Sequence, residues 1–313
     1  MLAFAKRTVL ASTIAVAASM LLAAPAWATW SIDGVDPDTG QVGVAVASCV
    51  PFDVGRVAVV VPGNGAGSSQ AKINTGSGEP MAEAMAAGAA PQQVIDAVTA
   101  AKFDDDAASR QFGVVLLGKG GAGYSGSKNQ AVAVDRRNAA GTASAQGNIL
   151  VAERVVDDAL AAFDRTDGPL AAKLVAALAA GSAAGGDSRC GEQTASSASL
   201  IVAEPNDPPW VHTDAPLSGP IAAQAATPST YVSVVNRRGG ANAVTALAAA
   251  YESATPVDGK IYVRNVQFGG EAAHPALVLG ALAVVLAVIV GIVTAAIRAR
   301  RRRRARRSVS SDT

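Results

Sequence analysis

The sequence predicts an α+β fold with largely antiparallel β-sheets because of the order of its strand-like and helical segments. Strand-like segments occur at both ends of the region 29–253, and pairs of helical segments lie between them. Hairpin-type turns join many of these strands. The sequence holds no P-loop and no GxSxG elbow, so it gives no support for phosphate binding of that type or for an α/β-hydrolase.

The first two strands are predicted from an Asp-Pro-Asp-x-Gly turn that separates two β-type runs. The run 42–47 is almost continuously apolar, which suits a strand buried on both faces. The Gly-rich stretch 63–70 is predicted as a loop that enters another strand, and residues 118–123 as a hairpin turn rather than a phosphate cradle. The predicted strands span residues 29–35, 41–48, 56–61, 111–117, 122–130, 141–150, 196–204 and 231–235.

Helices are predicted where Ala-rich segments show helical spacing. Gly88 and Pro91 divide the first such segment, 80–101, into two short helices. Pro169 stands at a favourable first position of a later helix. The remaining predicted helices span residues 151–163, 169–180 and 241–253, and residues 254–275 are predicted as a linker.

The N-terminus has the pattern of a secretory signal peptide. Lys6 and Arg7 precede an apolar run that ends in Pro25, and small residues follow at the −3 and −1 positions, Ala26 and Ala28. We therefore expect residues 1–28 to be removed between Ala28 and Thr29. The alternative is an uncleaved N-terminal anchor.

The C-terminus has the pattern of a single transmembrane helix. Residues 276–297 carry no charge, and 22 residues in a helix span roughly 33 Å, enough to cross a bilayer core. An Arg-rich tail follows at 298–313, which the positive-inside rule keeps in the cytoplasm, where it contacts anionic lipid. A nucleic-acid-binding tail is the alternative, but the adjacent apolar span already explains the charge. We expect residues 29–270 outside the cytoplasm, with membrane lipid rather than nucleic acid as a partner.

The central region carries more acidic than basic residues, which suits a soluble domain that does not bind polyanions. It contains both cysteines, Cys49 and Cys190. In an oxidising compartment an isolated pair suggests a disulfide; two buried thiols or a catalytic cysteine are the alternatives. The chain has only two histidines, His212 and His274, and shows no metal-ligand spacing, so we expect no metal and no cofactor.

Thr29 would be the first residue of the cleaved chain. A hydroxyl beside a free α-amino group is a minimal nucleophile–base pair, because the amine, with a pKa near 7.7–8.0, can take the hydroxyl proton at neutral pH. No histidine is then needed. The plain alternative is that Thr29 only marks the place where cleavage occurs.

From Thr29 to about residue 253 the chain resembles the DUF1028 family, an uncharacterised group assigned to the Ntn-hydrolase superfamily. The order and spacing of five short pieces carry the resemblance: residues 29–32 with 36–40, 43–48, 146–150, 168–171, and 184–189 followed by Ser197-Ala198. The resemblance implies a four-layer αββα sandwich with an N-terminal nucleophile, Thr29, on its first strand. It also strengthens the disulfide prediction, because Cys190 departs from the family pattern.

Other site residues follow from the needs of amide hydrolysis. Asn148 and the N–H of Gly147 are the candidate oxyanion donors; a turn held by the Asn side chain is the alternative. Further candidates follow strands or precede one, and would bind substrate or orient the α-amine: Ser48, Ser69, Gln70, Asp187 and Arg189. A purely structural role is the alternative for Ser48, Ser69 and Gln70, and an ordinary loop ion pair is the alternative for Asp187 and Arg189.

Two functions are compatible with these residues. The first is a membrane-anchored extracytoplasmic amidohydrolase that acts on an unknown amide-containing substrate. The second is a non-catalytic surface module for binding or assembly, with contacts carried by residues 118–128 or 205–220. A second copy of the chain is a further candidate partner, as a homodimer. N-terminal sequencing of the mature protein separates these hypotheses.

Overall fold

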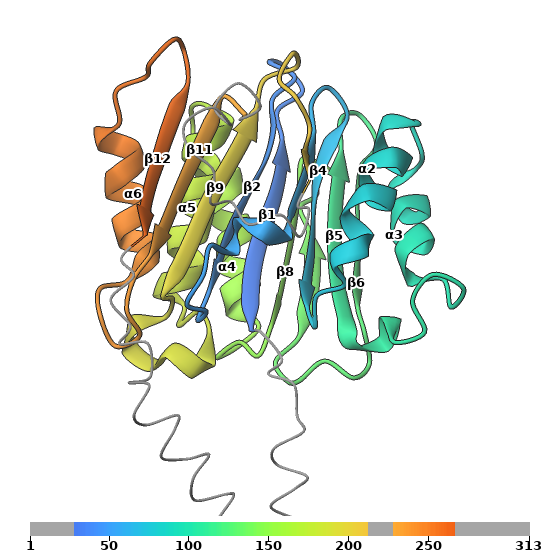
Figure 1. Cartoon of the computed structure of the whole chain (residues 1–313), viewed down its shortest axis with the longest axis horizontal. Helices are drawn as coiled ribbons and strands as arrows, with labels where there is room; N and C mark the ends of the chain where they lie inside the picture. The colour runs from blue at the N-terminus through green and yellow to red at the C-terminus, as the bar shows by residue number, and fades with distance from the viewer. Residues whose placement is uncertain (1–27, 212–227, 267–313) are drawn as a thin grey trace, which may run out of the picture. The chain divides into compact units, whose positions relative to one another are not determined.

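Strand-forming segments assemble into two β-sheets in the computed structural model, which describes residues 28–211 and 228–266 (Figure 1). The seven-stranded sheet has the order β12-β11-β9-β2-β1-β8-β7, and the five-stranded sheet the order β10-β3-β4-β5-β6. The first contains β1 (Thr29–Val35), β2 (Val42–Ser48), β7 (Val134–Arg137), β8 (Ala143–Asn148), β9 (Ser197–Ala203), β11 (Thr230–Val235) and β12 (Ile261–Val266). The second contains β3 (Ala58–Val61), β4 (Gly65–Ala71), β5 (Arg110–Leu116), β6 (Gly120–Ser125) and β10 (Trp210–Val211).

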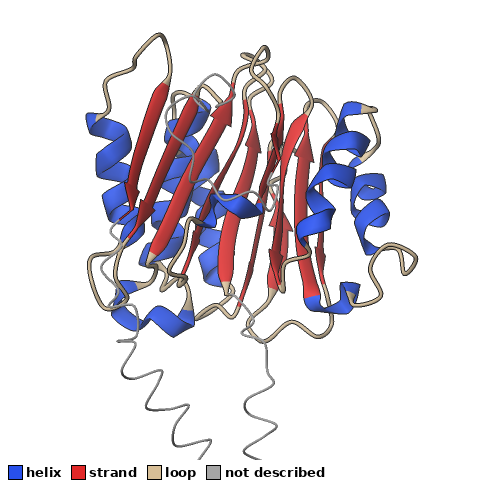
Figure 2. Cartoon of the chain, in the orientation of Figure 1, coloured by secondary structure: helices blue, strands red, loops and turns tan. Residues whose placement is uncertain are grey.

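Helices pack on the outer faces of both sheets (Figure 2). The seven-stranded sheet is covered by α4 (Arg154–Arg165), α5 (Leu170–Ala183) and α6 (Ala243–Ser253). The five-stranded sheet is covered by α2 (Gly78–Ala86) and α3 (Pro91–Thr99). Short 3₁₀ turns complete the described chain: η1 (Val54–Val57), η2 (Thr75–Ser77), η3 (Ala107–Ser109) and η4 (Ser188–Gln193). The prediction of a mixed α+β fold is confirmed.

The two sheets face each other through a second apolar cluster. Val44 and Val46 of β2 meet Val60 of β3 and Ala66 of β4 there. Strand pairing is antiparallel throughout both sheets except between β11 and β12, which run parallel and are joined by α6. A parallel pair requires a crossover of this kind, because a hairpin can join only antiparallel strands.

Strand β1 lies inside its sheet, with β2 on one side and β8 on the other. Its side chains alternate: Trp30 and Ile32 pack into the cluster formed with α4 and α5. Ser31 and Asp33 point the other way, toward the five-stranded sheet, where they bond residues of β4. Thr29 shares their face because successive side chains of a strand point to opposite sides. The nucleophile candidate is therefore placed between the sheets, at one end of a central strand.

The structure contains four strands that the sequence does not predict as strands: β4, β7, β10 and β12. Residues 65–71 form β4 rather than a loop, because Gly67 leaves the room that Met81 and Met85 of α2 occupy. Residues 261–266 form β12 inside the segment predicted as a linker, and its partner β11 lies some thirty residues earlier, beyond the reach of a local pattern. The two short helices divided at Gly88 are confirmed, and so is a hairpin turn at Gly118, although residues 120–123 of the predicted turn already belong to β6.

Several predictions fall on residues outside the described part of the chain. These are the signal peptide up to Trp27, His212, His274, the transmembrane span 276–297 and the Arg-rich tail. Within the described residues, no helix combines the length and apolarity needed to cross a membrane.

Candidate active site

Thr29 lies beside candidate residues that are far from it along the chain. In the register of the sheet it faces Ser48 at the end of β2 and Asn148 at the end of β8. Its side chain is buried, with 2% of the residue exposed, in a chain that still carries Ala28. Thr29 Oγ1 donates to Ser48 Oγ over 3.4 Å, a long hydrogen bond.

The carbonyl oxygen of Ala28 accepts two hydrogen bonds at this point. Ser48 Oγ donates at 2.5 Å and Arg189 Nη2 donates at 2.9 Å. Ala28 has no exposed surface. The bond that would be cut to release Thr29 is therefore held inside the folded domain, and its carbonyl oxygen is held by polar groups from two separate segments.

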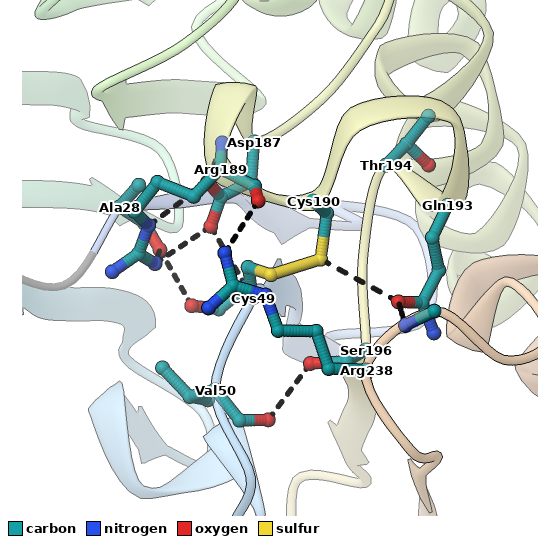
Figure 3. Close-up of a disulfide and its surroundings, with 12 residues drawn as sticks. Ala28, Cys49, Val50, Asp187, Arg189, Cys190, Gln193, Thr194, Ser196 and Arg238 are labelled. Atoms are coloured by element: carbon teal, nitrogen blue, oxygen red, sulfur yellow. Dashed lines mark hydrogen bonds and ion pairs between the residues drawn. A yellow bond between two sulfur atoms is a disulfide. The ribbon is translucent and has the colours of Figure 1, made fainter.

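Arg189 is oriented by Asp187 in a bidentate pair (Figure 3). Its Nε lies 3.0 Å from Asp187 Oδ1, and its Nη2 lies 2.7 Å from Asp187 Oδ2. Asp187 is fully buried, and its carboxylate also accepts from the backbone N–H of Cys49 at 2.7 Å and of Arg189 at 3.0 Å. A buried carboxylate needs this full set of donors, because burial of an unpaired charge is costly. The guanidinium is thereby fixed in a direction that reaches residue 28.

A disulfide joins Cys49 to Cys190, with the two Cα atoms 5.6 Å apart, which confirms the pairing predicted from the sequence. Cys49 directly follows Ser48, and Cys190 directly follows Arg189. The covalent link therefore ties together the two segments whose side chains hold the carbonyl oxygen of residue 28 (Figure 3). The rest of η4 is supported by Gln193, whose side chain bonds the backbone of the loop after β11.

A network of buried amides and hydroxyls continues from Thr29 between the sheets. Gln70 of β4 donates to the backbone oxygen of Thr29 at 3.3 Å and to Gln111 at 2.8 Å, and accepts from Ser31 at 2.7 Å. Gln146 of β8 donates to Ser31 at 2.6 Å and to Asp33 Oδ2 at 3.0 Å. These contacts fix the position and orientation of the first residue of β1, Thr29.

Gly113 of β5 makes the crossing of Gln146 possible. A Cβ built on Gly113 would lie 1.8 Å from Gln146 Oε1, so only glycine leaves space for this side chain between the sheets. Asp33 ends the network, where Ser68 and Gln146 donate to it. Burial raises the pKa of the Asp33 carboxyl to about 7, although both hydrogen bonds lower it.

Two residues at this end of the domain have a strained backbone conformation. Ile149, which follows Asn148, has φ of 54°, and Ala71, which follows Gln70, has φ of 69°. A β-branched residue in the left-handed region is a genuine outlier, and such strain persists only where surrounding contacts hold it. At Ile149 the holding contact is Ser188, whose N–H and hydroxyl both donate to the Ile149 oxygen, at 3.1 and 2.8 Å.

The residues selected from the sequence separate into two groups. Thr29, Ser48, Asn148, Gln70, Asp187 and Arg189 gather at one end of the sandwich, linked by the contacts and strand register described above. Ser69 faces the opposite side of β4, where its hydroxyl lies 2.7 Å from Ser77 Oγ at the start of α2. Gly147 pairs with Trp30 in the register, and a Cβ on it would contact Leu150 of the helix-side cluster.

Sequence reasoning missed the interior of the network: Ser31, Asp33, Gln111 and the carbonyl of residue 28. A signal existed in β1, where Ser31 and Asp33 alternate with Trp30 and Ile32. Polar residues on one face of a strand and apolar residues on the other usually indicate a solvent-facing side. Here β1 is central and both faces are covered, so the polar face lines a buried network instead.

Comparison with known proteins supplies the family. Residues 29–217, more than half of the chain, match the family model described as "Family of unknown function (DUF1028)". The chain belongs to the DUF1028 family. The crystal structure of protein SPO2555 from Silicibacter pomeroyi, described with the DUF1028 family model, is similar at 27% identity and a TM-score of 0.58. That similarity covers 74% of this chain and 91% of SPO2555, and no curated protein matches.

The DUF1028 match begins at Thr29, the residue that starts β1 and receives the contacts described above. Among the described residues, no cluster of three or more His, Cys, Asp or Glu side chains could hold a metal ion. The end of β1 in this DUF1028 domain brings together the Thr29 hydroxyl, Ser48, the Asp187–Arg189 pair and buried amide side chains.

Proposed function

We propose that this protein is an N-terminal-nucleophile amidohydrolase with the four-layer αββα sandwich of the Ntn-hydrolase superfamily, and that Thr29 is its nucleophile. The single observation that supports the proposal most is the position of Thr29. It is the first residue of a central strand and of the family match, and Ser48 and the Asp187–Arg189 pair converge on the bond that precedes it. A residue with no function beyond marking a cleavage site would need no such surroundings.

The reaction follows from the groups at the strand end. Once residues 1–28 are removed, the α-amine of Thr29, with an ordinary pKa near 7.7–8.0, takes the proton of its own hydroxyl. Oγ1 then attacks the carbonyl carbon of an amide. The sequence selects Asn148, which neighbours Thr29 in the register, and Gly147 as candidate oxyanion donors, in competition with the two groups that bond the carbonyl oxygen of residue 28. Gln70 fixes the Thr29 backbone while this happens.

Export and anchoring belong to the same proposal. The signal peptide 1–28 directs the domain out of the cytoplasm and its removal creates the catalytic amine. The span 276–297 and the Arg-rich tail hold the domain on membrane lipid, with the C-terminus in the cytoplasm. The substrate is an extracytoplasmic compound that contains an amide bond.

The test compares Thr29→Ala with Thr29→Ser in protein exported by its own leader. We expect N-terminal sequencing to give Thr29 as the first residue and intact-mass analysis to show one adduct of a hydroxyl-directed electrophile, a vinyl sulfone. Thr29→Ser retains the hydroxyl and the adduct, whereas Thr29→Ala loses it. Thr245→Ala, a threonine on the exposed face of α6, is the matched control and should label like the parent.

Two outcomes would contradict the proposal. A mature N-terminus at any other residue removes the nucleophile–base pair. Equal labelling of the parent and Thr29→Ala places the reactive group elsewhere, and then the non-catalytic binding module becomes the better account of the domain.

A further inference from the structure

The two donors on the carbonyl oxygen of residue 28 form a defined pair. Ser48 Oγ and Arg189 Nη2 approach this single oxygen at 2.5 and 2.9 Å. Ser48 is fully buried, and the Arg189 side chain is 26% exposed while its partner Asp187 is fully buried. Convergence of two donors on one oxygen is the arrangement that stabilises the oxyanion of an acyl-transfer reaction.

The carbonyl of residue 28 is the chain's own counterpart of a substrate carbonyl. Its carbon is bonded to the nitrogen of Thr29, and the nucleophile Oγ1 belongs to the same residue. An acyl carbon bonded to both that nitrogen and that Oγ1 would close a five-membered ring, so an acyl group on the nitrogen and an acyl group on Oγ1 lie close to the same place. Their oxygens therefore occupy neighbouring positions, and Ser48 Oγ, already 3.4 Å from Thr29 Oγ1, is within reach of both.

We propose that Ser48 and Arg189 are the oxyanion-stabilising residues for acyl transfer to Thr29, in the place that the carbonyl of residue 28 leaves when the chain is cut. This inference rests on the proposed function. Asp187 is a positioning residue, since it holds Arg189 through two hydrogen bonds. The Cys49–Cys190 link fixes the distance between the two donors.

Acylation transfers the acyl group of the substrate from nitrogen to Thr29 Oγ1, and deacylation transfers it to water. The Thr29 hydroxyl proton passes to the α-amine, Oγ1 bonds to the carbonyl carbon, and the carbonyl π electrons move to its oxygen, which Ser48 O–H and Arg189 N–H stabilise. The C=O bond re-forms, the C–N bond breaks, and the leaving amine takes the proton from the α-ammonium. Water then adds to the ester carbon and loses a proton to the α-amine. The C–Oγ1 bond breaks as the α-ammonium returns this proton to Oγ1, which releases a carboxylic acid and restores the Thr29 hydroxyl and the free amine.

The position of the charged residues supports this pair over donors on β8. Arg189 brings a permanent cation to the residue-28 oxygen, and a guanidinium held by a carboxylate costs little reorganisation during the reaction. Arg238 adds a second cation to the same segment, where its Nη2 donates to the Arg189 backbone oxygen at 2.7 Å. Asn148 lies on the opposite side of β1 from Ser48.

Two probes on protein that begins at Thr29 test the pair. The first is p-nitrophenyl acetate, whose reaction with Thr29 passes through a carbonyl oxyanion and is followed by p-nitrophenol release and the acetyl mass. The second is a vinyl sulfone, which adds to Oγ1 without forming a carbonyl oxyanion. The variants are Ser48→Ala, Asn148→Ala and the matched control Ser199→Ala, a buried serine of β9 that bonds Asp53 and not the site.

We expect Ser48→Ala to slow acetylation roughly 10²-fold, the usual effect of losing one oxyanion donor, while the vinyl sulfone rate stays close to that of the parent. Ser199→Ala should change neither rate. Arg189→Lys keeps the charge but loses the bidentate pair with Asp187, so it should also slow acetylation selectively. This second variant serves where Ser48→Ala lowers the thermal midpoint and yields too little folded protein.

Three results would overturn the inference or what it rests on. If Ser48→Ala and Arg189→Lys slow both probes equally, the two residues are structural only. If Asn148→Ala slows acetylation selectively and Ser48→Ala does not, the oxyanion is held from β8. If Thr29→Ala reacts like the parent with both probes, the proposed function itself fails, a result that the other two do not produce.

Discussion

At the scale of single residues, Asp33 is a fully buried carboxyl of the network between the sheets and gives the domain a pH dependence. Its pKa of about 7 in the folded chain, raised chiefly by burial, compares with 3.8 for the unfolded chain. Between these values the folded state binds more protons than the unfolded state, so stability falls as the pH rises. Across this window the free energy of unfolding should fall by up to about 4 kcal/mol, at 1.36 kcal/mol per pKa unit.

Asp33→Asn should flatten this dependence, because an amide does not titrate. The measurement is urea unfolding of the parent and the variant at several values between pH 4 and pH 8, with the disulfide intact. Asp38→Asn, which changes an exposed carboxyl in the β1–β2 turn, is the control and should keep the parent slope. A slope that survives in Asp33→Asn would assign the pH dependence to other groups.

At the scale of elements, the disulfide joins the end of β2 to η4 across 141 residues of chain. A cross-link that closes so long a loop typically contributes about 2–5 kcal/mol to stability. It also keeps Arg189 beside Ser48, so its loss should affect the site as well as the fold.

The double variant Cys49→Ser with Cys190→Ser should therefore unfold at lower urea concentration and acetylate Thr29 more slowly than the parent. Addition of a thiol reductant should move the parent toward the variant and leave the variant unchanged. If thiol titration shows two free cysteines in reduced parent protein while both unfolding and acetylation stay the same, the link is not a positioning device.

The extent to which the sequence predicts each element depends on where its contacts come from. Strands β1, β2 and β9 are recognisable because their apolar patterns are local. β4 is not, since its Gly65 and Gly67 lower strand propensity and are required only by close neighbours in β5 and α2. β12 is missed because its parallel partner is joined to it through a whole helix.

The site shows the same division between local and distant contacts. Residue type and position after or before strands are enough to select Ser48, Asp187 and Arg189 as candidates. Their meeting at the residue-28 carbonyl depends on contacts across 20 and 161 positions of the chain. No local pattern contains these contacts, so the meeting of Ser48 and Arg189 beside Thr29 becomes visible only in the folded domain.

At the scale of the whole molecule, the bond between Ala28 and Thr29 is inaccessible after folding. Ala28 is fully buried, Thr29 is 2% exposed, and β1 is paired on both sides. A peptidase must bind the bond in an extended and accessible segment. Cleavage at this bond by an external peptidase therefore has to precede the docking of β1 between β2 and β8.

A folded chain that keeps residue 28 should be inactive although its domain is intact. Its Thr29 nitrogen is an amide rather than a basic amine. The carbonyl oxygen of residue 28 already accepts the hydrogen bonds that Ser48 and Arg189 would donate to a substrate. We expect protein that begins at Ala28 to match protein that begins at Thr29 in thermal midpoint but to form no vinyl sulfone adduct and no acetyl adduct by intact mass. Equal labelling of the two proteins would show that the freed amine is not the base. Labelling of the shorter protein alone would make removal of residue 28 the activating step of the proposed enzyme. It would also explain why the predicted cleavage site and the proposed catalytic groups lie at one strand end.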